Sequence, residues 1–172
     1  MSRIVSRGAT FSEPGMRATL IRIWDITLPR IAFVGANPGK ADGKIDDATA
    51  RKYIGFATRW GFGSYVAGNL FQWVATDMTE LIARIVAGLP VNPPDAASWL
   101  AAEMIGARPQ CICLAWGNEP KQIARTWDRR AGEVRRLVRR LDVPIVCAAR
   151  NRTGDPAHLS RLPYTAAPLS WT

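Results

Sequence analysis

Three polar residues that can take part in base chemistry follow apolar runs typical of buried strands. Asn37 follows the run at 31–36, Asn69 follows the run at 65–68, and His158 lies in the loop beyond the run at 143–147. An asparagine amide offers a paired donor and acceptor that match the edge of a nucleobase. A histidine can donate a hydrogen bond to an oxyanion that develops during bond cleavage. These residues are candidates for a site that recognises a base.

Each of these residues also has a structural interpretation. The segment Asn37-Pro38-Gly39 is common turn chemistry, although its glycine also permits the close approach of a ligand. Asn69 can cap a strand end, with Phe71 and Trp73 as core aromatics rather than stacking partners. His158, the only histidine, can be a loop residue without chemistry. Both interpretations stay open when the residues are taken one at a time.

A group of aspartates follows Asn37. Asp42, Asp46 or Asp47 could act as a general base or position a water. Asp46 and Asp47 fit equally well at the start of a helix, where carboxylates satisfy free amides. Trp116-Gly117 ends another apolar run, and we interpret it as packing plus a turn.

Apolar periodicity predicts the elements that would position these residues. Short apolar runs bounded by turn residues predict buried strands at 31–36, 65–68, 110–115 and 143–147. Helical patterns occupy 49–60, 76–87, 96–107, 119–127 and 129–141. This alternation predicts an α/β fold, a three-layer α/β/α sandwich around a mainly parallel four-stranded sheet, in which ligands bind at the carboxyl ends of the strands.

The ends of the chain complete this prediction. The alternating residues 16–24 predict an N-terminal strand at the edge of the sheet. We expect a single domain over 1–172, with a loose arm at 1–15 and a loop-like tail at 148–172.

The chain is strongly basic, with 23 Lys and Arg against 14 Asp and Glu and a net charge of +9. This balance favours a polyanionic partner, and arginine in particular binds phosphate bidentately and stacks on bases. The arginine-rich segment 125–140 could track a phosphate backbone or form a solvated helix face. The large side chains at 159–162 could insert into a base stack or pack the tail onto the domain.

Other features bear on cofactors and location. Cys111, Cys113 and Cys147 lie in apolar runs or at their ends, and with one histidine they are too few to indicate a metal site. No apolar run approaches the ~18 residues of a bilayer span, and no secretory signal is recognisable. We therefore expect a monomeric cytoplasmic protein without a metal, an organic cofactor or a membrane partner.

Taken together, the strand-end segments resemble the motifs of the uracil-DNA glycosylase superfamily. Phe-Val-Gly-Ala-Asn-Pro-Gly at 33–39 resembles its first motif, closest to the Gly-x-Asn-Pro-Gly signature of the mismatch-specific branch. Asn69 stands where the superfamily has its base-reading asparagine, and 113–117 resembles the end of its third strand. His-Leu-Ser-Arg-Leu at 158–162 resembles the loop that supplies a histidine and a leucine wedge.

A second resemblance covers most of the chain. The segments 37–42, 46–49, 60–61, 69–71, 116–117 and Gly-x-Pro-x-His at 154–158 are similar to the pattern of a family of small bacterial and phage proteins filed as a domain of unknown function. That family usually has Asn-Pro-Ser and His-Pro, where this chain has Asn-Pro-Gly and His-Leu. No aspartate stands beside Asn37 as in enzymes that remove uracil efficiently, which points to a different base.

The glycosylase resemblance implies a protein that binds duplex DNA, flips a nucleotide and cuts its N-glycosidic bond. It implies water positioning by Asn37 with Asp46 or Asp47, and stabilisation of the leaving base by His158. The implied base-binding residues are Gly35, Pro38, Gly39, Asn69 and Phe71. The implied DNA-binding residues are Lys40, Arg152, Leu159, Ser160 and Arg161, with Leu159 or Arg161 filling the gap in the duplex.

The expected substrate is a modified pyrimidine, such as a hypermodified base of a phage genome, whose removal would serve antiviral defence. Two alternatives remain: a non-catalytic nucleic-acid-binding protein of the same fold, and a hydrolase of free nucleotides or nucleosides. The net charge of +9 disfavours the second alternative, because a small substrate does not require it.

Overall fold

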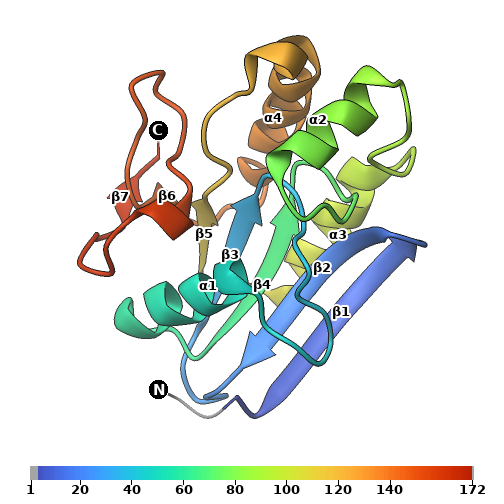
Figure 1. The fold of residues 1–172 in the computed structure, drawn as a ribbon. Coiled ribbons are helices and arrows are strands. Elements are labelled where there is room, and N and C mark those ends of the chain that lie inside the picture. The colour runs from blue at the N-terminus through green and yellow to red at the C-terminus, as the bar shows by residue number, and fades with distance from the viewer. Residues whose placement is uncertain (1–3, 172) are drawn as a thin grey trace.

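A mixed seven-stranded sheet forms the centre of the computed structural model, which describes residues 4–171 (Figure 1). The strand order is β1-β2-β4-β3-β5-β6-β7. The parallel strands are β4 (Ser64–Asn69), β3 (Arg30–Gly35), β5 (Cys111–Leu114) and β6 (Ile145–Cys147). The predicted strands are all present, but the sheet is larger and more mixed than the mainly parallel four-stranded one we expected.

An N-terminal hairpin accounts for most of this difference. β1 (Ser6–Glu13) pairs antiparallel with β2 (Met16–Ile23), so the predicted loose arm is wrong over the described residues, and only 1–3 lie outside them. β2 is not an edge strand, because β1 and β4 flank it. The connecting turn requires Gly15, which has a φ of +77° and would place a Cβ 2.8 Å from the Trp73 ring.

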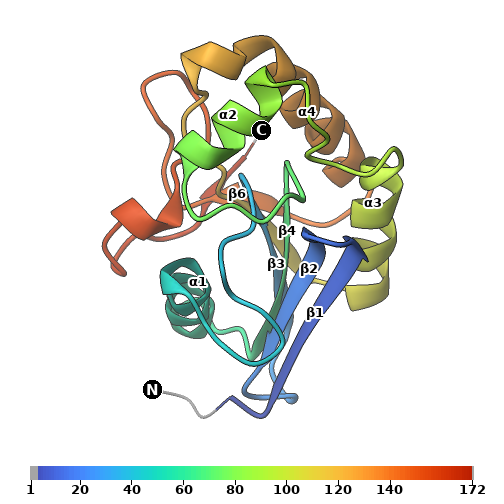
Figure 2. The same ribbon diagram turned by 45° about the vertical axis from the view of Figure 1, so that its right-hand side comes forward.

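Helices cover both faces of the sheet, as predicted (Figures 1 and 2). The helices are α1 (Ala48–Arg59), α2 (Met78–Val86), α3 (Ala96–Ala107) and α4 (Ala124–Val138). Ile31 and Phe33 of β3 face the apolar core beneath α1, whereas Ala32 and Val34 face the core beneath the other three helices. No helix in the described part of the chain is long and apolar enough to cross a membrane.

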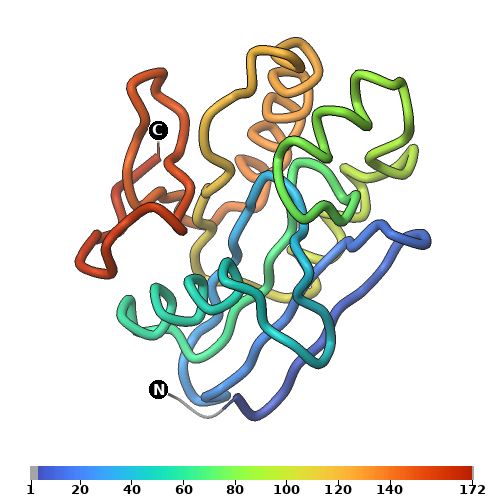
Figure 3. Tube along the Cα trace, viewed as in Figure 1, coloured from blue at the N-terminus to red at the C-terminus, as the bar shows by residue number. Residues whose placement is uncertain are grey.

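The C-terminal half departs from prediction at two places. One helix, α4, replaces the two predicted at 119–127 and 129–141, because Trp127, Ala131, Val134 and Val138 keep a helical spacing on its buried side. A short 3-10 helix, η1 (Lys121–Ile123), precedes it. The tail is also more regular than expected, with a 3-10 helix, η2 (Leu159–Arg161), and β7 (Leu169–Ser170), which pairs with β6 (Figure 1). Figure 3 shows the course of this tail, coloured orange to red, along one side of the domain.

The carboxyl ends of the parallel strands lie at one edge of the sheet. Gly35 and Asn69 are partners at the ends of β3 and β4, and the Ala115 N–H donates to the Val34 carbonyl just beyond β5. The Leu70 N–H donates to the Gly35 carbonyl at 2.9 Å, which ties the next loop to the sheet. The loops that follow the parallel strands are therefore held side by side.

Candidate functional site

A cleft of about 630 Å³ opens at this edge of the sheet. Its wall comes from the loops after β3, β4, β5 and β6, together with the first turn of α1. Asn37 and His158, predicted from distant parts of the sequence, both line it. The position agrees with the rule that ligands of such sheets bind beyond the carboxyl ends of the strands.

A smaller cavity of about 20 Å³ adjoins the cleft, and Asn69 lines it together with Arg17 and Tyr53. Asn37 and Gly39 line both spaces, so the two are neighbours. The smaller cavity has room for one water-sized group. The structure thus brings Asn37 and His158 into one cleft, and it places Asn69 just behind them.

The side-chain oxygen of Asn37 is available as a hydrogen-bond acceptor. Its Nδ2 donates to the carbonyls of Pro38 at 3.1 Å and Ala75 at 3.3 Å, which fixes the orientation of the amide. No described residue donates to its Oδ1. A carbonyl oxygen in this position can accept a hydrogen bond from a water in the cleft, which is the role predicted for Asn37.

Gly35 makes room for the buried polar pair Asn69 and Tyr53. A Cβ at Gly35 would lie 2.8 Å from both Asn69 Oδ1 and the Tyr53 hydroxyl, closer than any real Cβ approaches. Asn69 is 7% exposed, and its amide makes no hydrogen bond with a described residue. Burial raises the pKa of Tyr53, so its hydroxyl stays neutral. The predicted base-reading amide is therefore held at the small cavity with its hydrogen-bonding capacity unused.

His158 presents a defined donor. Its Nδ1 accepts from the Ser160 backbone N–H at 3.3 Å and lies 2.7 Å from the Ser160 hydroxyl. Because Nδ1 accepts, the proton of the neutral ring sits on Nε2. Burial, and to a lesser extent Arg161, lowers the pKa of His158 below its ordinary value. A neutral imidazole with a protonated Nε2 suits donation to an oxyanion.

The histidine loop is held without the proline that the family pattern usually has after the histidine. The Gly117 N–H donates to the Pro156 carbonyl at 2.9 Å, and the Ala157 N–H donates to the Ala149 carbonyl at 2.8 Å. Gly117 has a φ of +83°, and a Cβ there would lie only 3.2 Å from His158 Cβ. The turn Trp116-Gly117 beyond β5 therefore lies directly against the histidine, in addition to its predicted packing role.

The aspartates after Asn37 make contacts that support the fold, and none of them lines the cleft, so their catalytic role stays a prediction. Asp46 Oδ1 lies 2.5 Å from Nε of the buried Arg22. Asp47 caps α1 by accepting from the Ala50 N–H at 2.8 Å. Asp42 accepts from two backbone N–H groups of its own turn, and these bonds lower its pKa. Asp47 reaches only the small cavity, and no other member of the group lines either space.

Asp77 is the acidic residue that does line the cleft, and the sequence analysis missed it. It caps α2, where Oδ1 accepts from the Glu80 N–H at 3.0 Å. Helix-capping aspartates are common, so its sequence context carried no signal of a further role. Its second carboxylate oxygen has no partner among the described residues.

Two buried donors in the cleft wall were also missed. Trp116 Nε1 and Asn151 Nδ2 are shielded from solvent and have no hydrogen-bond partner in the described part of the chain. Trp116 is 1% exposed, and its type and position indicated packing alone. Unpaired buried donors are rare, so these two leave hydrogen-bonding capacity unused in the wall of the cleft.

Arg17 supports the loop that carries Asn37. It is 4% exposed, and its guanidinium donates to the carbonyls of Gly39 and Ala41. Burial lowers its pKa, whereas the charge of Asp47 raises it. The alternating pattern of the strand did not reveal this burial, because arginine is usually exposed.

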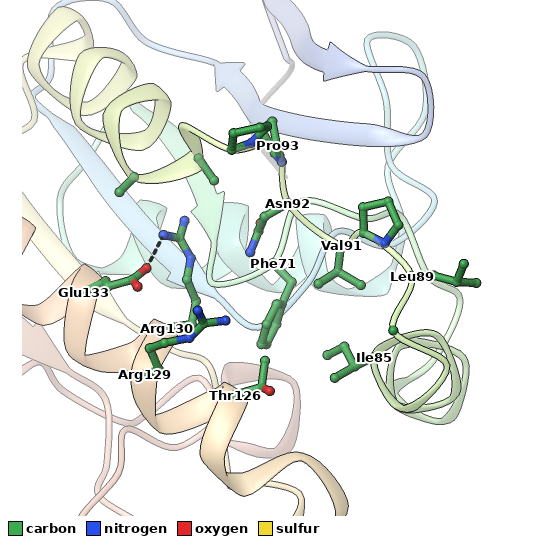
Figure 4. A pocket seen from close by; sticks show the side chains of 15 residues that line it. Phe71, Ile85, Leu89, Val91, Asn92, Pro93, Thr126, Arg129, Arg130 and Glu133 are labelled. Atoms are coloured by element: carbon green, nitrogen blue, oxygen red, sulfur yellow. Dashed lines mark hydrogen bonds and ion pairs between the residues drawn. The ribbon is translucent and has the colours of Figure 1, made fainter.

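Phe71 does not join the predicted base-binding group. It is 1% exposed, packs 5.8 Å from the Trp127 ring, and lines a different cavity of about 520 Å³ between residues 88–97 and α4 (Figure 4). In that cavity Arg130 donates to the Leu70 carbonyl at 2.6 Å and pairs with Glu133 at 3.0 Å. Phe71 is a core aromatic, the alternative that the sequence left open.

The predicted DNA-binding residues divide into three groups. Ser160 and Arg161 are exposed and line the cleft. Lys40 and Arg152 are exposed but do not line it. Leu159 is fully buried in the core beneath α1, so its predicted insertion into a base stack is wrong and it packs the tail onto the domain.

The described residues contain no group of three or more His, Cys, Asp and Glu side chains that could hold a metal ion. A sequence profile of the family described as "Protein of unknown function (DUF1643)" matches residues 17–158. No curated protein and no solved structure matches the chain significantly. The match confirms the resemblance to a family of unknown function, and the glycosylase resemblance stays a prediction.

Proposed function

This chain belongs to the DUF1643 family, and we propose that it is a DNA glycosylase that removes a flipped base and leaves an abasic site. One observation carries this proposal: Asn37 with a free acceptor and His158 with a free donor line one cleft, next to the unpartnered amide of Asn69. Cleavage of an N-glycosidic bond needs a held water and a donor for the leaving base, and an amide beside the cleft is a group that can recognise a base.

The proposed reaction breaks the bond between C1′ of the sugar and the base nitrogen. The electron pair of this bond passes to the base, and His158 Nε2–H donates to the base oxygen on which the charge develops. Asn37 Oδ1 holds the water whose oxygen bonds to C1′. The proton that this water loses passes to the carboxylate of Asp77, and solvent protonates the departed base.

Asp77→Asn tests the proposed role of this carboxylate. We expect excision to fall about 100-fold, because the amide cannot accept the proton or balance the cationic sugar. Asparagine caps helices as well as aspartate does, so the fold should keep its stability. The matched control is Asp95→Asn at the start of α3, which lies outside the cleft and should leave excision unchanged. Full excision by Asp77→Asn would remove Asp77 from the mechanism.

The proposed substrate is DNA with a modified pyrimidine, and the proposed role is defence against phage whose genomes carry such bases. The cleft volume of about 630 Å³ is within the range of small-molecule sites and leaves space beyond a flat base. The absence of an aspartate next to Asn37 separates this site from those that remove plain uracil.

A panel of duplexes tests this proposal. Each duplex carries thymine, uracil, 5-hydroxymethylcytosine or its glucosylated form at one position, and alkali converts abasic sites into strand breaks. We expect breaks at a modified pyrimidine and intact strands with thymine. Intact strands on every modified duplex would refute excision, and retained DNA binding would then favour the non-catalytic alternative.

A further inference from the structure

A basic groove runs beside the cleft, between α1 and the C-terminal tail. Its volume is about 870 Å³, and α1 contributes Arg51, Lys52 and Arg59 to its wall, opposite Ser160 and Tyr164. No aspartate or glutamate is among the described residues that line this groove. It therefore differs from the cavity of Figure 4, in which Glu133 accompanies the arginines.

The three cations of the groove have no carboxylate partner. Each is held by a carbonyl instead: Arg51 by Asp46 at 2.5 Å, Lys52 by Leu162 at 2.8 Å and Arg59 by Gly55 at 3.1 Å. In the described part of the chain, none of them forms an ion pair. Their charges are thus positioned but not neutralised.

Tyr164 gives this charged surface a fixed shape. Lys52 Nζ and Arg59 Cζ each lie 4.3 Å from the centroid of its ring. The ring packs so closely on Gly55 that a Cβ there would collide with it. The aromatic ring therefore holds two cations in place along one side of α1.

The groove continues into the cleft. Ser160 lines both spaces, and it is also the residue that holds His158 through Nδ1. A polymer whose one unit entered the cleft would place its neighbouring units over α1. α1 and α4 cover opposite faces of the sheet, so a path over α1 is separate from a path over α4 (Figure 2).

We propose that the groove binds the phosphates of the DNA strand that flank the flipped nucleotide, so that the strand runs over α1 and not over the arginine-rich helix α4. This inference rests on the proposed function, because it takes the polymer to be the DNA whose base enters the cleft. Unpaired cations in a groove without acidic residues match a phosphodiester chain, and the shared Ser160 gives the point at which this chain reaches the cleft.

Two matched double variants test the path. Arg51→Gln with Arg59→Gln removes two exposed charges from the groove, and Arg125→Gln with Arg136→Gln removes two exposed charges from α4. Neither pair includes Lys52, so the bond from Lys52 to the tail is kept. The measurement is the affinity for an unmodified duplex over a series of salt concentrations, together with the melting temperature of each variant.

We expect the groove variant to bind about tenfold more weakly, with a salt slope lower by about 0.9 for each phosphate that it no longer neutralises. The α4 variant should change affinity by less than about twofold. Equal decreases in both variants, or a larger decrease in the α4 variant, would overturn the path. Normal excision by the groove variant would also overturn the proposed path of the strand. This result would leave the proposed glycosylase function intact. A wild-type protein that bound no DNA would refute both.

Discussion

Replacement of His158 by alanine is expected to lower the rate of base excision by about 100- to 1,000-fold, the usual cost of removing one oxyanion donor. The expectation follows from the tautomer of the His158 ring. Because Nδ1 accepts a hydrogen bond from the Ser160 backbone N–H, the ring proton is on Nε2, which can act as the donor in the cleft. DNA affinity should stay within about twofold, because this bond strengthens only as the base departs. Single-turnover excision and equilibrium binding measure the two effects separately.

The pH profile distinguishes this role from a merely structural one. Because the pKa of His158 lies below its ordinary value of 6.5, the neutral ring persists from neutral pH to below 6.5. Protonated Nδ1 cannot accept from the Ser160 N–H, so excision should fall only on the acid side of that value. His158→Gln keeps a hydrogen-bond donor, so it should recover part of the excision rate. This rate should not fall at acid pH as the wild-type rate does. A wild-type rate that already falls above pH 6.5, or full activity of His158→Ala, would contradict the assignment.

Replacement of Asp46 by alanine is expected to lower the free energy of unfolding by about 3 kcal/mol, because it leaves a buried guanidinium without its counter-charge. The Arg22 side chain is fully buried, and its Nε lies 2.5 Å from Asp46 Oδ1. Bonds from Arg22 to the carbonyls of Ile21 and Asp42, both at 2.7 Å, survive the change and limit the destabilisation. Urea unfolding measures this decrease in the free energy of unfolding.

Arg7→Ala is the matched control for Asp46→Ala. Arg7 meets the same carboxylate at 3.4 Å from a more exposed position, so its removal should cost no more than about 0.5 kcal/mol. The folded Asp46→Ala protein should excise at the wild-type rate. If it lost excision but kept its stability, Asp46 would return to the catalytic residues.

The sequence was sufficient to predict the parallel strands and where they end. Apolar runs such as 31–36 are closed by turn residues, and the carboxyl ends of parallel strands must meet at one edge. Asn37 and His158 could therefore be assigned to one cleft before the fold was known. The N-terminal hairpin was missed because residues 6–13 are mostly polar and lie at the edge of the sheet, where little burial marks them.

Buried charge explains most of what could not be predicted at the site. Arg17 and Arg22 lie inside the domain, where charged residues seldom occur without partners. Only the fold shows that Asp46 forms an ion pair with Arg22 and that Asp47 caps α1. Leu159 could equally have been a wedge or a core residue, because its neighbours in sequence do not reveal what packs against it.

The most direct test of the central claim measures the free base and the abasic site in one reaction, with DNA that carries modified pyrimidines. We predict that the wild-type protein releases one base for each abasic site formed, and that Asn37→Ala forms neither while it still binds the DNA. Release of no base from any such DNA, combined with hydrolysis of free nucleosides, would contradict the claim and assign the cleft to a small substrate.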